Sequence, residues 1–294
     1  MFLVGFFISN RWMLAEKKLL AATRAGSTVE AIELIKESVN LHSTDIAHGS
    51  LSNAYLKDAV EEGQKQPPNL SRINSDLTSA ISEARRALDI SPDSVGLWLN
   101  LANVYDNAAV LVPDARKFAI NATQNAHNLE PYNPEHYYRL GYYYEQMKDW
   151  QNAIVYYEEA VKLNPDYNIA KQALVGAYEQ IKQTDKALSL VQEDVSGNPG
   201  DVAGQYNYGR LLYNRNLKGD RDEAEQIWQN VLKINPNYSN ALFSLGVLYE
   251  IRKNYPKALN YFYKVRDLNP LKNDNSNADA VKAINDKINL LLNK

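Results

Sequence analysis

A repeat of about 34 residues runs through the sequence and constrains the fold more than any other feature. The clearest unit, 134–167, holds two amphipathic segments and a closing proline. In the first segment, the positions spaced i, i+3, i+4 and i+7 fall on one helix face and are Tyr137, Leu140, Gly141 and Tyr144. The second segment and the end of the unit are marked by Ala153, Tyr157, Ala160 and Pro165. The spacing predicts a pair of antiparallel helices in each unit.

The same positions recur over most of the chain. The predicted units are 12–44, 45–94, 95–133, 134–167, 168–201, 202–238 and 239–272. Six of them end in a proline, which disfavours helical geometry in the residue before it; these are Pro92, Pro131, Pro165, Pro199, Pro236 and Pro270. Asn133 before Pro134 predicts a helix start, with asparagine as the N-cap. A further amphipathic segment, 277–294, is expected to cap the last unit.

The order of aromatic, Leu, Gly, Tyr, Ala, Phe, Ala and Pro positions resembles the tetratricopeptide repeat. This resemblance implies an all-α fold, in which residues 11–294 form one right-handed superhelical solenoid of about seven helix-turn-helix repeats. Helix content above about 70% is expected, against roughly one third in an average globular protein. A single helix pair cannot bury its own apolar face, so neighbouring pairs must stack.

The resemblance also implies where a partner would bind. In such solenoids the first helix of each pair forms the inner, concave wall. The residues predicted to face that wall and bind a partner are Asn100, Asn103, Tyr138, Arg139, Tyr142, Tyr206, Asn207, Arg210 and Tyr213. Rigid aromatic rings beside adaptable amides are typical of a recognition surface for a peptide or a glycan. The alternative is that individual tyrosines only pack between helices.

Composition argues against several other classes of function. The net charge of −3 and a pI near 5.9 do not suit a nucleic-acid-binding array. Cysteine is absent, and the four histidines form no metal-binding motif, so they are expected to be solvated at helix ends. With no nucleotide-binding glycine loop either, we predict no catalytic residues, no cofactor and no metal, and therefore no enzyme activity.

The N-terminal segment 1–10 is apolar from Met1 to Ile8, too short to span a bilayer alone. We interpret it as the possible end of a transmembrane helix. Trp12 stands where an interfacial aromatic would, and basic residues follow at Arg11, Lys17, Lys18 and Arg24. The excess of basic residues on this flank predicts a membrane-associated chain with its repeats on the cytoplasmic side.

A narrower resemblance joins the start of the chain with the stretch from Trp98 to Gly141. The hydrophobic insertion Val110-Leu111-Val112-Pro113 within that stretch is similar to one in the C-terminal repeats of bacterial O-antigen ligase or polymerase-like membrane proteins. Their catalytic residues lie in a membrane part that has no counterpart in this sequence. The resemblance implies a non-catalytic scaffold that binds a peptide, a protein or the glycan-assembly machinery. The alternative is a free-standing soluble adaptor in secretion or pilus assembly.

Overall fold

The computed structural model describes residues 2–268 and 278–293, and this part of the chain is 80% helical with no strands. The predicted all-α helical solenoid class is therefore confirmed. The first eight helices are α1 (Phe2–Ala22), α2 (Thr28–Leu41), α3 (Asp45–Gly63), α4 (Leu70–Ile90), α5 (Val95–Ala108), α6 (Ala115–Leu129), α7 (Pro134–Gln146) and α8 (Trp150–Leu163). The others are α9 (Asn168–Gln180), α10 (Thr184–Gly197), α11 (Val202–Arg215), α12 (Asp220–Ile234), α13 (Ser239–Ile251), α14 (Tyr255–Leu268) and α15 (Ala278–Leu292). Pro270 and Asn277, predicted to close the last unit and to begin the cap helix, lie outside the described residues.

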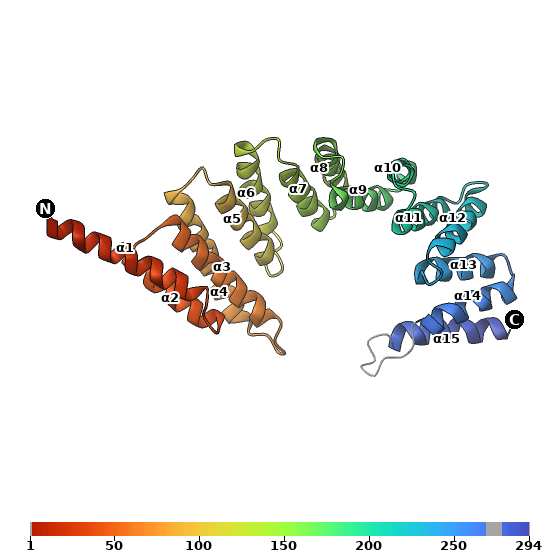
Figure 1. Ribbon diagram of the computed structural model, residues 1–294, viewed down its shortest axis with the longest axis horizontal. Coiled ribbons are helices and arrows are strands. Elements are labelled where there is room, and N and C mark those ends of the chain that lie inside the picture. Colours follow the sequence, from red (N-terminus) through yellow and green to blue (C-terminus); the bar gives the residue numbers. More distant parts are fainter. Residues whose placement is uncertain (1, 269–277, 294) are drawn as a thin grey trace. The chain divides into compact units, whose positions relative to one another are not determined.

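The helices form two compact units, residues 1–170 and 171–294, each a series of packed helices. In the first unit α1 packs on α2, α3 on α4, α5 on α6 and α7 on α8, and each pair contacts the next one along the chain (Figure 1). In the second unit the helices from α10 to α15 each pack on the following one, and α11 also contacts α13. The predicted start of α7 is confirmed, because the Asn133 side chain accepts a hydrogen bond from Glu135 N and proline follows it.

Close packing within a pair depends on a glycine that faces an aromatic ring. A Cβ atom on Gly141 would lie 2.5 Å from the ring of Tyr157, which is fully buried. The same arrangement recurs in the second unit at Gly209 with Trp228. It also recurs at Gly246, against the ring of Phe262. The repeat motif is therefore steric, since only glycine lets the first helix approach the aromatic residue of the second.

The turn between the two helices of a pair also repeats. Lys148, Lys182, Asn216 and Lys253 all adopt left-handed backbone conformations, with φ between 57° and 61°. The amide that follows each of the three lysines bonds back to the first helix, as in Asp149 N to Tyr144 O at 2.9 Å. These bonds satisfy carbonyl groups that a helix end would otherwise leave without partners.

The expectation that all four histidines are solvated is wrong for two of them, His136 and His48. His136 is fully buried, and His48 is 4% exposed. The reason lies in the register of α7, where His136, Leu140 and Tyr143 are spaced i, i+4 and i+7 and all three point into the core. Neither ring nitrogen of His136 has a hydrogen-bond partner. Burial consequently lowers the pKa of His136, although the Glu130 carboxylate opposes this shift.

The N-terminal residues continue α1 beyond the helix with which it pairs (Figure 1). Arg11 Nη2 donates to the carbonyl of Asn40 at 3.1 Å, near the last residue of α2. Ser38 Oγ donates to Ala15 O at 2.8 Å one turn further on. Residues 2–9 thus extend the axis of α1 past the end of α2. No helix among the described residues combines the length and the hydropathy that a membrane span requires.

Candidate functional site

The first unit contains a pocket of ≈310 Å³ between the first helices of two consecutive pairs, α5 and α7. Four of the nine predicted partner-binding residues line it, namely Asn103, Tyr138, Arg139 and Tyr142. The others that line it are Asp106, Glu135, Tyr143 and Tyr167. The pocket brings together rings, carboxylates and one guanidinium group.

Helical spacing explains why these side chains meet. On α5, Asn103 and Asp106 are three residues apart and share a face. On α7 the four positions 135, 138, 139 and 142 are spaced i, i+3, i+4 and i+7. Tyr167 comes from the segment between α8 and α9, and its ring centroid lies 5.6 Å from that of Tyr138. Tyr138 also packs against Tyr157 at 5.8 Å, so its ring is held on two sides.

Two ion pairs hold the carboxylates that line the pocket, Glu135 and Asp106. Arg139 donates from Nε and Nη2 to Oε1 of Glu135, at 3.0 and 2.6 Å. Arg116 on α6 donates from Nε to Oδ1 of Asp106 at 2.9 Å. The Arg116 and Asp106 side chains are only 15% and 18% exposed, so this pair is largely withdrawn from water. Partly buried pairs of this kind are screened less by salt than surface pairs.

The tyrosine hydroxyls stay protonated at neutral pH. Burial, followed by the charge of Asp106, raises the pKa of both Tyr142 and Tyr143. Burial and the charge of Glu145 raise the pKa of Tyr138, and burial and Glu135 raise the pKa of Tyr167. Each neutral phenol can both donate and accept a hydrogen bond, in addition to offering an aromatic face.

Asn100 lies on the same helix as Asn103, but it takes part in a separate polar contact. Its amide nitrogen donates to Asn53 Oδ1, and its oxygen accepts from Ser52 Oγ at 3.0 Å. Both partners belong to α3. Asn100 therefore links two first helices to each other.

The remaining predicted residues lie on α11 of the second unit. Arg210 forms a bidentate pair with Glu179, with N···O distances of 2.8 and 2.9 Å. Tyr206 and Tyr213 both pack against Trp228, at 6.4 and 5.7 Å between ring centroids, and Asn207 is half-buried. In this unit the aromatic side chains of the set contribute to packing between α11 and α12.

Sequence reasoning missed four residues of the pocket, Asp106, Glu135, Tyr143 and Tyr167. The sequence pattern could have pointed to Tyr167, because a tyrosine two residues after the closing proline recurs at Tyr238. The ring of Tyr238 packs against that of Tyr206, with 5.4 Å between the centroids. Asp106 and Glu135 sit one helical turn from predicted residues, so the same face could have been extended to them.

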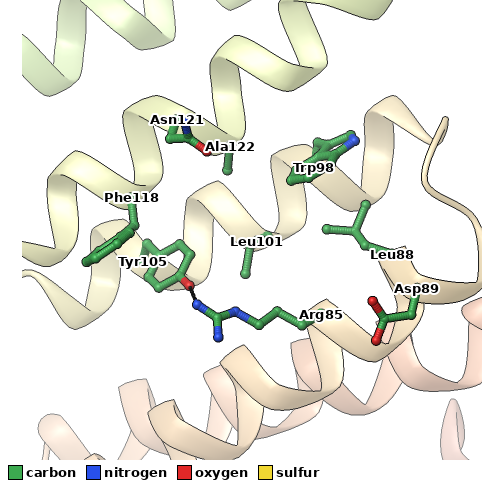
Figure 2. A pocket seen from close by; sticks show the side chains of 9 residues that line it. All are labelled: Arg85, Leu88, Asp89, Trp98, Leu101, Tyr105, Phe118, Asn121 and Ala122. Carbon is green, nitrogen blue, oxygen red and sulfur yellow. Dashed lines mark hydrogen bonds between the residues drawn. The ribbon is translucent and has the colours of Figure 1, made fainter.

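A second pocket of ≈360 Å³ lies between α4 and α6, with α5 as its floor (Figure 2). Its aromatic wall is formed by Trp98, Tyr105 and Phe118, and Arg85 donates to the Tyr105 hydroxyl at 2.5 Å. Phe118 is 56% exposed. The exposed residue Val110 belongs to the hydrophobic insertion between α5 and α6. This pocket is more apolar in its side chains than the first one.

A third polar arrangement links the α2–α3 loop to α3 and α4. Ser43 Oγ lies 2.8 Å from His48 Nε2, and His48 Nδ1 lies 2.5 Å from Glu83 Oε2. The order of hydroxyl, imidazole and carboxylate is that of a nucleophile triad. Catalysis also needs oxyanion donors and a substrate cavity, and neither of the two pockets above includes these three residues. We interpret the arrangement as a structural link.

Comparison with known families identifies the repeat. Two family models described as tetratricopeptide repeat match residues 134–167 and 227–260. The chain contains tetratricopeptide repeats. The first match covers α7 and α8, and so includes most of the residues that line the ≈310 Å³ pocket. Repeats of this family typically form non-catalytic scaffolds for protein interactions.

Curated relatives match the chain at low identity. Lipopolysaccharide assembly protein B of Haemophilus influenzae is 21% identical over 265 residues, covering 81% of this chain and 61% of that protein. Protein O-mannosyl-transferase TMTC3 of Homo sapiens is 27% identical over 175 residues, covering 59% of this chain and 18% of that protein. The chain thus spans less than two thirds of either relative.

Solved structures show the same fold. The C-terminal part of a TPR repeat-containing protein from Cytophaga hutchinsonii matches with a TM-score of 0.67 at 14% identity, covering 90% of this chain and 97% of that one. A tetratricopeptide repeat protein from Parabacteroides merdae matches with a TM-score of 0.53 at 14% identity, covering 96% of this chain and 99% of that one. Identity at this level supports the fold alone.

Proposed function

We propose that the chain is a non-catalytic scaffold that binds a peptide segment of a partner protein in the ≈310 Å³ pocket between α5 and α7. The observation that carries this proposal is the pocket itself, which gathers four predicted partner-binding residues on two first helices. Its rings are held in place by their neighbours, as Tyr138 is by Tyr157 and Tyr167. A preorganised surface loses little conformational entropy on binding.

The chemistry of the pocket favours a peptide. Neutral phenols and the Asn103 amide can bond the alternating donors and acceptors of an extended main chain. The rings of Tyr138, Tyr142 and Tyr167, which are only partly buried, supply apolar contact area for its side chains. Aromatic residues and arginine are also the residue types that contribute most to binding energy at interfaces.

Selection from a displayed library of random peptides tests the proposal. The full chain serves as bait, and recovered peptides are measured against Tyr142→Ala and against Tyr132→Ala as a matched control, because Tyr132 is 84% exposed and outside the pocket. We expect peptides with micromolar affinity that lose about fivefold or more in affinity with the first variant and nothing with the second, since truncating a central aromatic contact costs more than about 1 kcal/mol. Equal binding to both variants would exclude this pocket.

We further propose that the scaffold serves glycan assembly at a membrane, with the repeats on the cytoplasmic side. Support comes from the likeness to lipopolysaccharide assembly protein B over 81% of this chain. The basic residues Arg11, Lys17, Lys18 and Arg24 after the apolar start of α1 also support it. Deleting the gene in the native host should change the length distribution of surface glycans on a gel. An unchanged distribution would contradict this context.

A further inference from the structure

The ≈310 Å³ pocket has an electrostatic bias that points to the charge of its occupant. Two of its eight lining residues are carboxylates, Asp106 and Glu135, and one is a cation, Arg139. A third carboxylate, Glu145, accepts a hydrogen bond of 2.5 Å from the hydroxyl of Tyr157, whose ring packs against Tyr138. Arg116 offsets Asp106 from the α6 side, where it is 15% exposed.

The pKa values of the four tyrosines are influenced more by nearby carboxylates than by nearby arginines when single charged groups are compared. After burial, the largest influence that raises the pKa of Tyr142 is Asp106, ahead of the opposing Arg116. For Tyr138 the Glu145 carboxylate outweighs Arg139. Tyr143 and Tyr167 follow the same order, with Asp106 and Glu135 ahead of Arg139. At each of the four phenols the largest influence of a charged group is that of a carboxylate, which agrees with the two carboxylates that line the pocket and favours a positive occupant.

The carboxylates also retain acceptor capacity. Arg116 bonds Oδ1 of Asp106, and Arg139 bonds Oε1 of Glu135. Each pair therefore uses one oxygen, and among the described residues Oδ2 of Asp106 and Oε2 of Glu135 are left to accept from a ligand. A carboxylate accepts up to about four hydrogen bonds in total.

An acidic occupant fits less well. Its carboxylate would approach Asp106 and Glu135, and the Nε and Nη2 donors of Arg139 are already engaged by Glu135. A guanidinium or ammonium group can interact favourably with both the tyrosine rings and the carboxylates of the pocket, because aromatic faces attract cations and carboxylates form ion pairs with them. The volume of ≈310 Å³ admits one long side chain.

We infer that the occupant of the α5–α7 pocket is a basic side chain, arginine or lysine, of the partner peptide, lying against the tyrosine faces with its charge toward Asp106 and Glu135. The inference rests on the proposed function and specifies its ligand. In this arrangement the peptide main chain lies across the rim of the pocket, and the basic residue anchors it.

The test is a titration of the full chain, carrying ¹³C-labelled tyrosine, with Nα-acetyl-arginine methylamide followed by NMR. The matched probes are the citrulline derivative, which has the same shape without the charge, and the glutamate derivative. We expect shifts of Tyr138, Tyr142, Tyr143 and Tyr167, with the arginine derivative binding at least about fivefold more tightly than citrulline. Resonances are assigned with single Tyr→Phe variants.

Charge variants complete the experiment. Asp106→Asn should weaken arginine binding by about fivefold or more, whereas Asp114→Asn, an equal change of charge at a 78% exposed site outside the pocket, should not. If citrulline shifts the same tyrosines as strongly, or glutamate does so more strongly, the pocket binds ligands but the inferred charge is wrong. If no probe shifts these tyrosines, the inference fails. The proposed function is decided separately by the peptide selection.

Discussion

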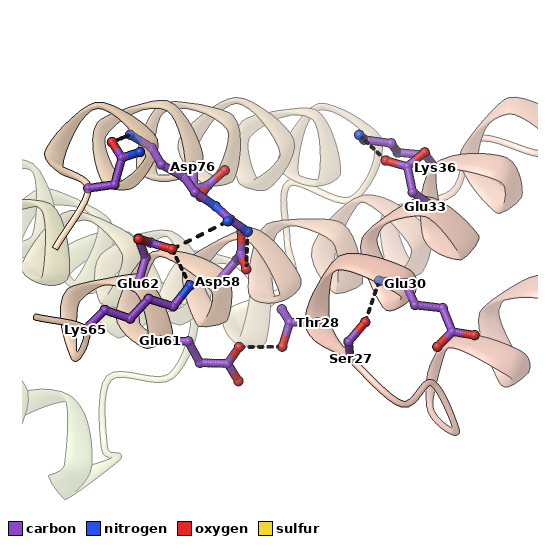
Figure 3. Close-up of polar contacts among 12 residues, drawn as sticks. Ser27, Thr28, Glu30, Glu33, Lys36, Asp58, Glu61, Glu62, Lys65 and Asp76 are labelled. Atoms are coloured by element: carbon purple, nitrogen blue, oxygen red, sulfur yellow. Dashed lines mark hydrogen bonds and ion pairs between the residues drawn. The ribbon is translucent and has the colours of Figure 1, made fainter. Parts of the chain in front are cut away.

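A cluster of buried carboxylates between α3 and α4 gives a sharp prediction about stability (Figure 3). Arg72 donates to Asp58 with a shortest distance of 2.7 Å, and it lies 3.5 Å from Glu62 and 3.7 Å from Asp76. One Asp76 oxygen is buried without a hydrogen-bond partner. Burial, and then the charge of Asp58, raise the pKa of Asp76 from 3.8 to about 6. Asp76 therefore carries a charge at pH 8 that the fold disfavours.

The direction and the size of the effect of Asp76 on the free energy of unfolding follow from proton linkage. The folded-state pKa of Asp76 lies above the unfolded value, so the folded state holds its proton more tightly. The associated stability is fully present below about pH 4 and is lost as the pH rises through about 6. A shift of roughly two pKa units, at about 1.4 kcal/mol per unit, corresponds to about 3 kcal/mol in the free energy of unfolding.

Replacing Asp76 by Asn removes the charge while keeping the shape. At pH 8 we expect the free energy of unfolding to rise by up to about 3 kcal/mol, and at pH 4 to change little. Urea unfolding followed by circular dichroism at several pH values measures this, with amide hydrogen exchange in α3 and α4 to localise it. The control is Asp89→Asn, at an exposed position on the same helix. Parallel pH profiles for Asp76→Asn and the wild type would show that the charge of Asp76 does not lower the stability of the fold.

Three further predictions concern packing, a buried histidine and the N-terminus. Gly141→Ala should lower the free energy of unfolding by about 1–3 kcal/mol in urea titrations, because its Cβ would meet the Tyr157 ring, whereas Gly96→Ala, with no atom within 4 Å, should not. His136→Leu should reduce the loss of stability between pH 7 and 5, since burial lowers the pKa of His136 and its protonation then favours the unfolded state; an unaltered acid profile would contradict this. Deleting residues 1–9 should abolish co-sedimentation with lipid vesicles while leaving the circular dichroism spectrum helical, and vesicle binding that survives the deletion would exclude this segment as the anchor.

The fold was predictable because its determinants are local. Where an aromatic ring of the second helix faces the first helix, glycine occupies the position of Gly141, as it does at Gly209 and Gly246. Together with the buried alanine at position 153, this keeps the spacing recognisable although most other residues vary between units. The alanine is fully buried, and a Cβ on the glycine would overlap a buried ring. Such steric requirements appear directly in a sequence as a period.

The candidate site was predictable only in part because it depends on the rotation of α7. The expected apolar face included Tyr137 and Tyr144, which are half-buried, whereas His136 and Tyr143 occupy the core. A histidine counts as polar in a pattern search, so its burial gave no signal. Tyr167 reaches the pocket from a connecting segment, and its contact with Tyr138 depends on tertiary structure.

Site-specific photo-crosslinking in the native host tests the central claim, that a partner binds between α5 and α7, most directly. Benzoylphenylalanine replaces Tyr142 in the pocket, Tyr132 on the exposed surface, or Phe118 at the apolar pocket of Figure 2. We expect a discrete crosslinked partner from position 142, with no such product from 132 or 118. A partner captured from position 118 or 132, but not from 142, would contradict it.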